Sequence, residues 1–173
     1  RKKVIKRGRT RYMVGDFVRD KDAVTATLLS CEIAAQKKAE GSSIYMYLQE
    51  IYKEFGYYQE KLISMVKKGK SGAEEIQEIL KTYRNNPPTK IAGSSVICIE
   101  DYKTSLSKNL LTGSSSAIQI PKSNVLIFYT EDGSKIAVRP SGTEPKIKFY
   151  ISVNGKNEEG LQEKIAAIIQ DLN

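Results

Sequence analysis

Apolar positions along this chain recur at two different spacings, and the spacings predict where helices and strands lie. Helix-forming segments, most with an apolar stripe of helical period, cover residues 22–40, 44–55, 71–84 and 161–172. Extended segments, with the clearest alternation in the last of them, cover residues 57–66, 96–99, 125–130, 134–138 and 147–153. Most of the predicted strands therefore lie between the third and the fourth helix.

Glycine, serine and proline mark the ends of these elements. Gly41 is placed to stop the first helix, and one of the two serines after it can cap the second. The sequence Ser-Gly-Ala-Glu at residues 71–74 predicts a capping box for the third helix. Glu-Asp-Gly at residues 131–133 predicts a hairpin turn, and the serine-rich residues 105–121 are expected to form a loop.

The order of elements after residue 70 predicts the fold class. Helix, strand, hairpin, strand and helix in succession are typical of an α+β domain with helices on one face of a small antiparallel sheet. The Lys-Lys-Gly-Lys run at residues 67–70 is interpreted as a linker. Residues 70–173 are therefore predicted to form a C-terminal domain, residues 22–69 part of a preceding domain, and residues 1–21 a basic leader that includes the start of that preceding domain.

Most of the net charge lies in that leader. The 173 residues carry a formal charge of +8, and residues 1–21 hold nine basic and two acidic side chains, a net of +7. Nucleic-acid binding usually requires a basic stripe across a folded face. A solvated or disordered leader is therefore favoured, and nucleic-acid association is the weaker alternative.

The cysteines and the missing histidine exclude several kinds of chemistry. Without histidine, this chain can perform no histidine-based hydrolysis and lacks the commonest zinc ligand. Cys31 and Cys98 lie in apolar segments and are predicted to be buried thiols in a reducing, cytoplasmic compartment, not a disulfide or a metal pair. No stretch approaches the roughly 18 apolar residues of a membrane span.

Residues 139–150, RPSGTEPKIKFY, form the segment with the most distinctive chemistry. The proline fixes its own φ, and Gly142 can adopt the positive φ of a tight reversal. Such a turn can direct backbone N–H groups at an anion, while Arg139, Ser141 and Thr143 add side-chain donors that match phosphate oxygens. The alternative is an ordinary β-turn with solvated side chains, because serine, glycine and proline are common turn residues.

A family resemblance bears on that choice. The segments VRPSGTEPKIKFYISV, LIFYTEDGSKIAVRPSG and GDFVRDKDAVTATLLSCEIAA resemble the α-D-phosphohexomutases, in particular the phosphoglucomutase and phosphomannomutase branch. The likeness runs from about Tyr12 to the end of the chain. It implies an enzyme that moves a phosphoryl group between C1 and C6 of a hexose through a bisphosphate sugar, with a glucose 1,6-bisphosphate-type activator.

The resemblance also implies which part of such an enzyme this chain is. The phosphoserine of the first domain and the aspartate-rich Mg²⁺ loop of the second have no counterpart here, so no catalytic residue and no metal ligand is assigned. The chain corresponds to the helical end of the third, α/β domain followed by the fourth domain. Alone, it is expected not to catalyse, and its partners are the missing domains and a sugar phosphate.

In this family the fourth domain grips the phosphate that is not reacting. The resemblance assigns that grip to Arg139, Ser141, Gly142, Thr143 and Lys148. Lys21 matches a family lysine that reaches the substrate from the third domain, and the alternative for Lys21 is a solvated charge at a helix start.

One stretch departs from the family pattern. Where the family carries a Glu-Glu-Ser loop that binds sugar hydroxyls, this chain has KRGRTRYM at residues 6–13. Arginine cannot accept hydrogen bonds from hydroxyls as carboxylates do. No sugar-reading carboxylate is therefore assigned, and the hexose preference is left open. A stand-alone phospho-ligand module without catalysis is the alternative function.

Overall fold

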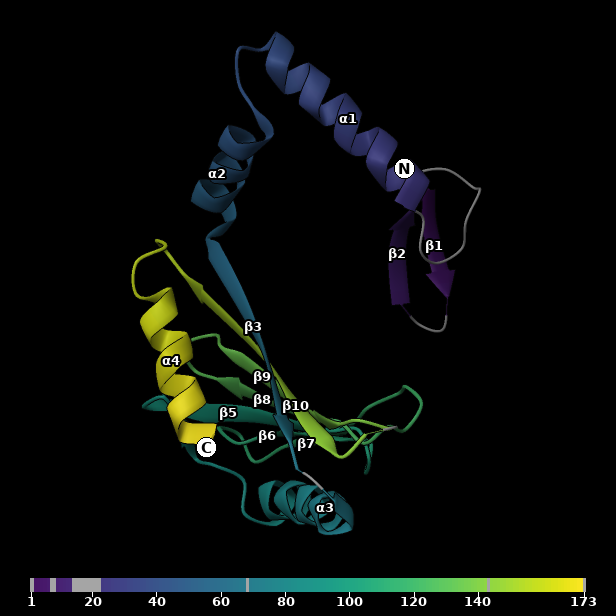
Figure 1. Ribbon diagram of the computed structural model, residues 1–173, viewed down its shortest axis with the longest axis vertical. Coiled ribbons are helices and arrows are strands. Elements are labelled where there is room, and N and C mark those ends of the chain that lie inside the picture. The colour runs from purple at the N-terminus through teal and green to yellow at the C-terminus, as the bar shows by residue number, and fades with distance from the viewer. Residues whose placement is uncertain (1, 7–8, 14–22, 68, 143, 173) are drawn as a thin grey trace. The chain divides into compact units, whose positions relative to one another are not determined.

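The structure is a computed structural model that describes residues 2–6, 9–13, 23–67, 69–142 and 144–172 (Figure 1). The chain divides into two compact units, Arg1–Phe55 and Gly56–Asn173. The domain limits expected from the family resemblance, near residues 69–70, concern the larger protein and stay a prediction.

The first unit contains two strands and two helices. Strands β1 (Lys2–Lys6) and β2 (Arg9–Met13) pair antiparallel, and the helices are α1 (Ala23–Ala39) and α2 (Ile44–Phe55). The leader was expected to be solvated or disordered, and these two strands rule out disorder for residues 2–6 and 9–13. Charge content guided the expectation, but strand pairing is made by backbone groups that every residue except proline supplies.

The connection between α1 and α2 follows the sequence prediction. Gly41 has a φ of 73°, and the Ser42 N–H donates to the Lys37 carbonyl at 2.7 Å, the pattern of a Schellman motif. The hydroxyl of Ser43 accepts from the Met46 N–H at 3.2 Å and so caps α2. The predicted stop and the predicted cap are both confirmed.

Neither helix of the first unit has a buried residue, and this corrects the prediction for Cys31. Its thiol is free and exposed, because the apolar side of α1 is uncovered, with Val24 71% and Leu28 62% exposed. Cys98, on a strand of the second unit, is also free and is half-buried, with its sulfur 3.6 Å from the Ser107 hydroxyl.

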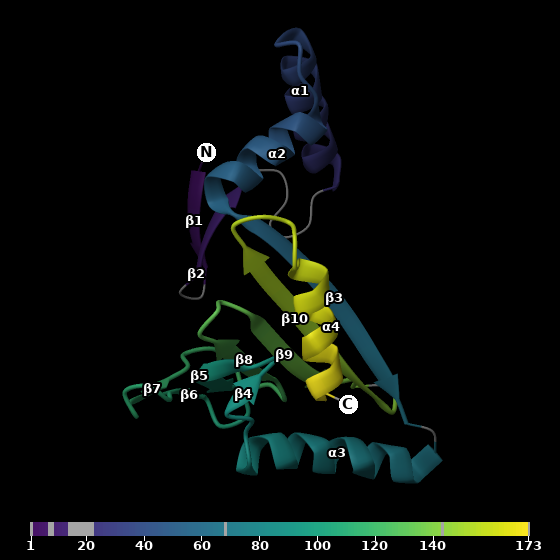
Figure 2. The same cartoon turned by 90° about the vertical axis from the view of Figure 1, so that its left-hand side faces the viewer.

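In the second unit, eight strands form one antiparallel sheet (Figure 2). Their order across the sheet is β3 (Tyr57–Val66), β10 (Lys146–Gly155), β9 (Lys135–Pro140), β8 (Leu126–Thr130), β5 (Ser94–Asp101), β6 (Leu106–Asn109) and β7 (Ser115–Ala117). The short strand β4 (Lys90–Ile91) pairs with β5. Helices α3 (Gly69–Asn85) and α4 (Leu161–Leu172) complete the unit.

Both helices pack on the same face of this sheet. Strand β10 alternates strictly, and its core-facing side chains are at most 1% exposed: Ile147, Phe149, Ile151 and Val153. They belong to one apolar cluster with Ile76 and Leu80 of α3 and with four residues of α4, which are Leu161, Ile165, Ile168 and Leu172. The predicted α+β architecture is confirmed. We call the opposite side of the sheet, from which Arg139, Lys148 and Tyr150 project, the open face.

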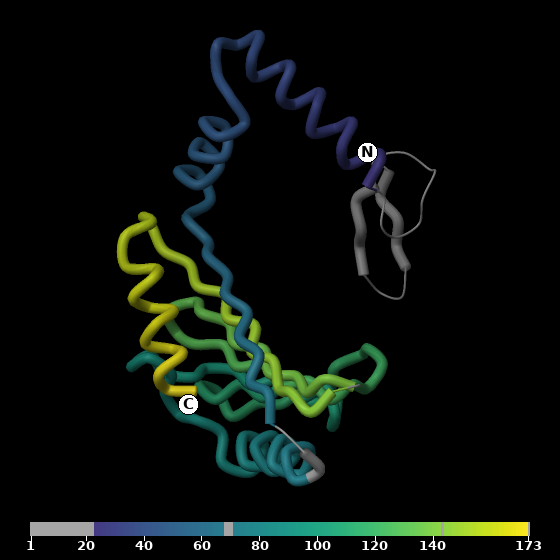
Figure 3. The backbone as a smooth tube through the Cα atoms, viewed as in Figure 1, coloured from purple at the N-terminus to yellow at the C-terminus, as the bar shows by residue number. Residues whose placement is uncertain are grey.

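Two local predictions about this unit are wrong. Residues 105–121 are not a plain loop, since β6 and β7 pair there and Gly113 turns between them with a φ of 71°. Helix α3 begins at Gly69, so Ser71 lies inside the helix and is not its cap. The Lys67 N–H, at the first position of the predicted linker, donates to the Pro145 carbonyl at 2.9 Å. Figure 3 shows the backbone of the sheet strands and of α4 in this unit.

The predicted hairpin between β8 and β9 is confirmed. Gly133 has a φ of 82°, and the Thr130 N–H donates to the Ser134 carbonyl at 3.0 Å. The carboxylate of Asp132 accepts from the Thr130 hydroxyl at 2.6 Å and pairs with Lys164 Nζ of α4 at 2.8 Å. This network ties the start of β9 to α4 and so holds the strand that leads to Arg139.

The Asp132 network predicts how the stability of the chain depends on pH. Burial raises the pKa of Asp132, but hydrogen bonds from Lys164, Thr130 and the Ser134 N–H outweigh it and hold the pKa well below the ordinary 3.8. The stabilisation is therefore complete above about pH 5 and is lost as pH falls from 3.8 toward the folded pKa. We expect Asp132→Asn to lower the free energy of unfolding by about 1 kcal/mol at pH 7, since the pair is partly exposed.

Urea unfolding of the variant and the parent chain at pH 7 and near pH 2.5 measures this effect. The difference between the two proteins should shrink at the acid pH. Glu131→Gln removes the neighbouring exposed carboxylate and should change little at either pH. An Asp132 effect of equal size at both pH values would contradict the role given to its charge.

Candidate functional site

The donor-rich turn joins β9 to β10 and is closed by backbone hydrogen bonds. The Ser141 N–H donates to the Lys146 carbonyl at 2.8 Å, and the Lys146 N–H donates to the Glu144 carbonyl at 2.7 Å. The bond from Lys67 to the Pro145 carbonyl attaches the turn to the end of β3. The turn is therefore closed by its own backbone hydrogen bonds and is also attached to the end of β3.

The strand register brings the two predicted cations together. Arg139 on β9 and Lys148 on β10 are Cα partners in the antiparallel ladder. Val138 and Phe149 face the core, so both cations project from the open face, because side chains alternate along a strand. Arg139 is exposed and Lys148 is half-buried, and the Cα partner of Lys148 on β3 is Ser64. Two positive charges thus stand next to the turn.

The backbone of the turn differs from the expected anion nest. Gly142 does not have a positive φ, unlike Gly133 in the preceding hairpin, and a Cβ at Gly142 would meet nothing within 4 Å. The Ser141 N–H is used to close the loop. The predicted positive φ of Gly142 is therefore wrong. Among the described side chains of the predicted site, the Arg139 guanidinium, Lys148 and the Ser141 hydroxyl are the donors that an anion could contact.

The acidic residue of the turn is paired within the turn. Glu144 forms an ion pair with Lys146, and the hydrogen bond from Lys146, followed by its charge, lowers the pKa of the Glu144 carboxyl. The charge of Lys148 acts in the same direction. Among the described residues, no ion pair or hydrogen bond engages the Arg139 guanidinium. The carboxylate therefore neutralises Lys146 and leaves Arg139 and Lys148 as an excess of two positive charges.

Two of the predicted site residues cannot be placed. Thr143 and Lys21 both lie outside the described residues. The phosphate-binding assignment of Arg139, Ser141, Gly142, Thr143 and Lys148 and the substrate contact of Lys21 stay predictions.

The described part of the chain offers no alternative centre for a metal and no membrane helix. Within it, no three cysteine or acidic side chains come close enough to hold a metal ion. Its helices are also too short or too polar to cross a bilayer.

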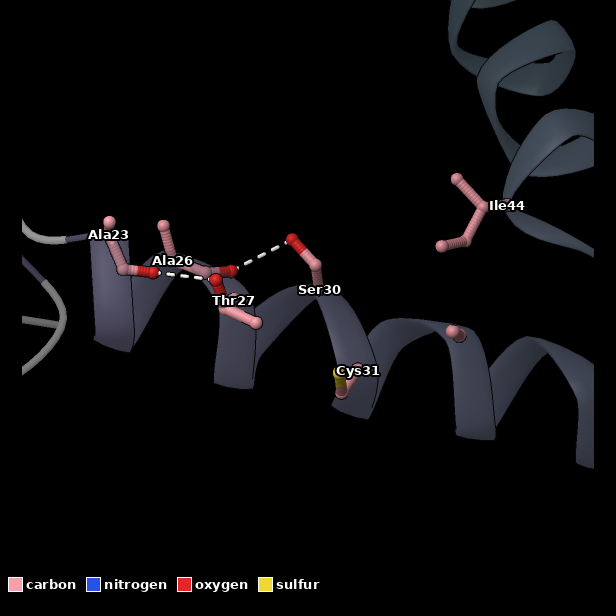
Figure 4. Close-up of a pocket in the computed structure, with 7 residues that line it drawn as sticks. Ala23, Ala26, Thr27, Ser30, Cys31 and Ile44 are labelled. Atoms are coloured by element: carbon pink, nitrogen blue, oxygen red, sulfur yellow. Dashed lines mark hydrogen bonds between the residues drawn. The ribbon is translucent and has the colours of Figure 1, made fainter.

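A hollow of about 480 Å³ runs along α1 in the first unit (Figure 4). Its lining is mostly small side chains: Ala23, Ala26, Thr27, Ser30, Cys31, Ala34 and Ile44. The hydroxyls of Thr27 and Ser30 already donate to carbonyls of their own helix, at 2.7 and 2.8 Å (Figure 4). Among the described residues, no charged group lines the hollow, so the chemistry of this lining does not suit a phosphate.

A second hollow, of about 340 Å³, lies between α3 and the β5–β6–β7 end of the sheet. Two cations of the described part of the chain line it. The half-buried Arg84 is already engaged by Asp101 at 3.2 Å and by the Asn124 amide oxygen at 2.6 Å, which leaves the single exposed Lys108. The open cationic pair at the β9–β10 turn therefore suits an anion better than either hollow.

Known proteins resemble this chain over most of its length. The family model described as "Phosphoglucomutase/phosphomannomutase, C-terminal domain" matches residues 64–168, which is more than half of the chain and includes the turn. A phosphoglucomutase of Staphylococcus haemolyticus (strain JCSC1435) is 40% identical over 154 residues, which cover 89% of this chain and 28% of that protein. A phosphoglucomutase of Staphylococcus aureus (strain MSSA476) is 41% identical over 158 residues, covering 91% and 28%. The chain thus spans about 28% of the length of these relatives.

A solved structure shows the same fold. It is the open form of the exocytosis-sensitive phosphoprotein pp63/parafusin from Paramecium, which is described as a phosphoglucomutase. The TM-score is 0.56 at 20% sequence identity, and the match covers 90% of this chain and 26% of that chain.

Proposed function

Because this chain belongs to the phosphoglucomutase and phosphomannomutase family and carries its C-terminal domain, we propose that it is the C-terminal part of a phosphohexomutase. The whole enzyme would interconvert hexose 1-phosphate and hexose 6-phosphate through a bisphosphate intermediate. The part described here would bind the phosphate that is not reacting and would not catalyse alone.

The pairing of Arg139 with Lys148 beside the closed turn carries this proposal. A guanidinium can grip two phosphate oxygens at once, and the nearby ammonium adds charge without fixing a direction. The two cations match the charge of a phosphate dianion because Glu144 is occupied by Lys146. A grip that recognises phosphate and ignores the sugar suits an intermediate that must turn over between two half-reactions.

The metal and the phosphoryl donor would come from the rest of the enzyme. The described residues do not fit a Mg²⁺ site, since no cluster of hard ligands forms among them. When bound in the complete enzyme, Mg²⁺ would stabilise charge on the phosphoryl group that moves. A glucose 1,6-bisphosphate-type activator belongs to the same proposal, as does a cytoplasmic location.

The isolated chain tests the proposal directly. Three or four charge-assisted hydrogen bonds contribute about 5–10 kcal/mol in total, and association costs about 4–15 kcal/mol. We therefore expect no mutase activity and only weak phosphate binding, roughly millimolar. Titration of the ¹⁵N-labelled chain with inorganic phosphate should shift the amide signals of the turn and of Lys148.

Arg139→Ala should remove those shifts and leave the remaining spectrum intact. Shifts confined to the basic leader, or to the surroundings of Arg84, would place the anion elsewhere and contradict the proposal. Mutase activity in the isolated chain would contradict its second half.

A further inference from the structure

The open face continues the candidate site along strand β10. Lys148 and Tyr150 stand on this face two residues apart, and the Cα partner of Tyr150 on β9 is Ala137. Two residues advance a strand by about 6.7 Å. The tyrosine ring is therefore separated from Lys148, which the phosphate would contact, by a distance similar to the width of a sugar ring.

Tyr150 is accessible to solvent although it lies in the second strand of the sheet. Its neighbour on β9 is an alanine, which is too short to cover an aromatic ring, and its partner on β3 is Leu62, itself 50% exposed. Tyr150 is 40% exposed as a result. Among the described residues, nothing hydrogen-bonds its hydroxyl. The ring of Tyr150 is thus an accessible apolar surface next to the pair of cations, Arg139 and Lys148, on the open face.

We propose that the ring of Tyr150 supports the hexose of a ligand whose phosphate is held by Arg139 and Lys148. This inference rests on the proposed function, because it requires the phosphate to be anchored at the turn. A pyranose presents C–H groups on its faces, and an aromatic face attracts the positive ends of such bonds. Such a contact does not depend on the hydroxyl pattern, so it can form in both orientations of a bisphosphate intermediate.

Kinetics of the full-length enzyme test the inference. Tyr150→Ala is expected to raise the KM for hexose phosphate by about tenfold, because the sugar loses its support. The inhibition constant for inorganic phosphate, which has no sugar, should differ between this variant and the parent enzyme by less than about twofold. Tyr150→Phe keeps the ring and should behave like the parent enzyme.

Tyr58 supplies a matched control. It lies on the same open face, on β3, is 55% exposed, and is the Cα partner of Asn154, four residues beyond Tyr150. Tyr58→Ala removes an equal aromatic surface from the end of the face that is remote from Arg139, and it should leave the KM unchanged. An equal rise in KM for the two alanine variants would overturn the inference, since it would indicate a general role of the open face.

The inference and the proposed function fail in different ways. If Arg139→Ala weakens phosphate inhibition but Tyr150→Ala leaves the KM unchanged, the phosphate grip stands and the sugar contact is overturned. If Tyr150→Phe is as impaired as Tyr150→Ala, the ring face is not the contact. If Arg139→Ala leaves phosphate inhibition unaltered, the grip itself is wrong, and the sugar contact that rests on it is overturned too.

Discussion

Arg139→Ala in the full-length enzyme is expected to lower kcat/KM for hexose phosphate by about 100-fold or more. Removing one partner of a desolvated charge pair costs about 2–5 kcal/mol, and about 2.7 kcal/mol corresponds to 100-fold. Under the proposed function both kinetic constants should suffer, because the remote phosphate would supply binding energy that orients the reacting end of the sugar. Steady-state kinetics with saturating activator measure the two constants separately.

Two further variants show whether kcat/KM depends on the bidentate guanidinium of Arg139 or only on positive charge. Arg139→Lys keeps the charge but cannot grip two oxygens, so it should recover only part of the activity. Lys135→Ala removes a cation from the same strand and the same open face, four residues before Arg139, and should leave kcat/KM unchanged. If Lys135→Ala were as damaging as Arg139→Ala, general electrostatic attraction would explain the effect and a specific grip would not.

Elements whose structure is decided by residues close together in the chain could be predicted from the sequence. The helix Ile44–Phe55, its serine cap, the Gly41 stop and the Asp-Gly hairpin all depend on residues within a few positions of one another. The β6–β7 pair was missed because its strands consist of short polar segments that carry little strand preference. The start of α3 was missed for another reason, since Lys67 is held by Pro145, far along the chain.

The candidate site also has features that the sequence predicts and features that only the fold shows. The sequence identified Arg139 and Lys148 as donors, but that they stand side by side follows from the β9–β10 register, which no local pattern reveals. Alternation along β10 could have shown that Tyr150 shares the face of Lys148, yet its exposure depends on the small Ala137 across the ladder. The pairing of Glu144 with Lys146, and not with Arg139, also needed the folded turn.

Phe149→Ala is expected to lower the free energy of unfolding of the chain by about 3–5 kcal/mol, the largest effect on stability that we predict. The ring is 1% exposed on the core face of β10, and the edge-on ring of Tyr83 from α3 lies with its centroid 6.4 Å away. Truncation leaves a cavity between the sheet and α3 that the β-ladder cannot collapse to fill. Because β10 carries Phe149 and Lys148 on consecutive positions, the loss should also weaken phosphate binding.

The neighbouring residue provides the control for this prediction. Tyr150→Ala removes a ring of similar size from the same strand, but from the open face, and should cost less than about 1.5 kcal/mol. Phe149→Leu keeps most of the volume and should also cost less than about 1.5 kcal/mol, which guards against an alanine variant that does not fold. Urea unfolding followed by far-ultraviolet circular dichroism measures all three. Equal losses for Phe149→Ala and Tyr150→Ala would contradict the assignment of one face to the core and the other to ligand.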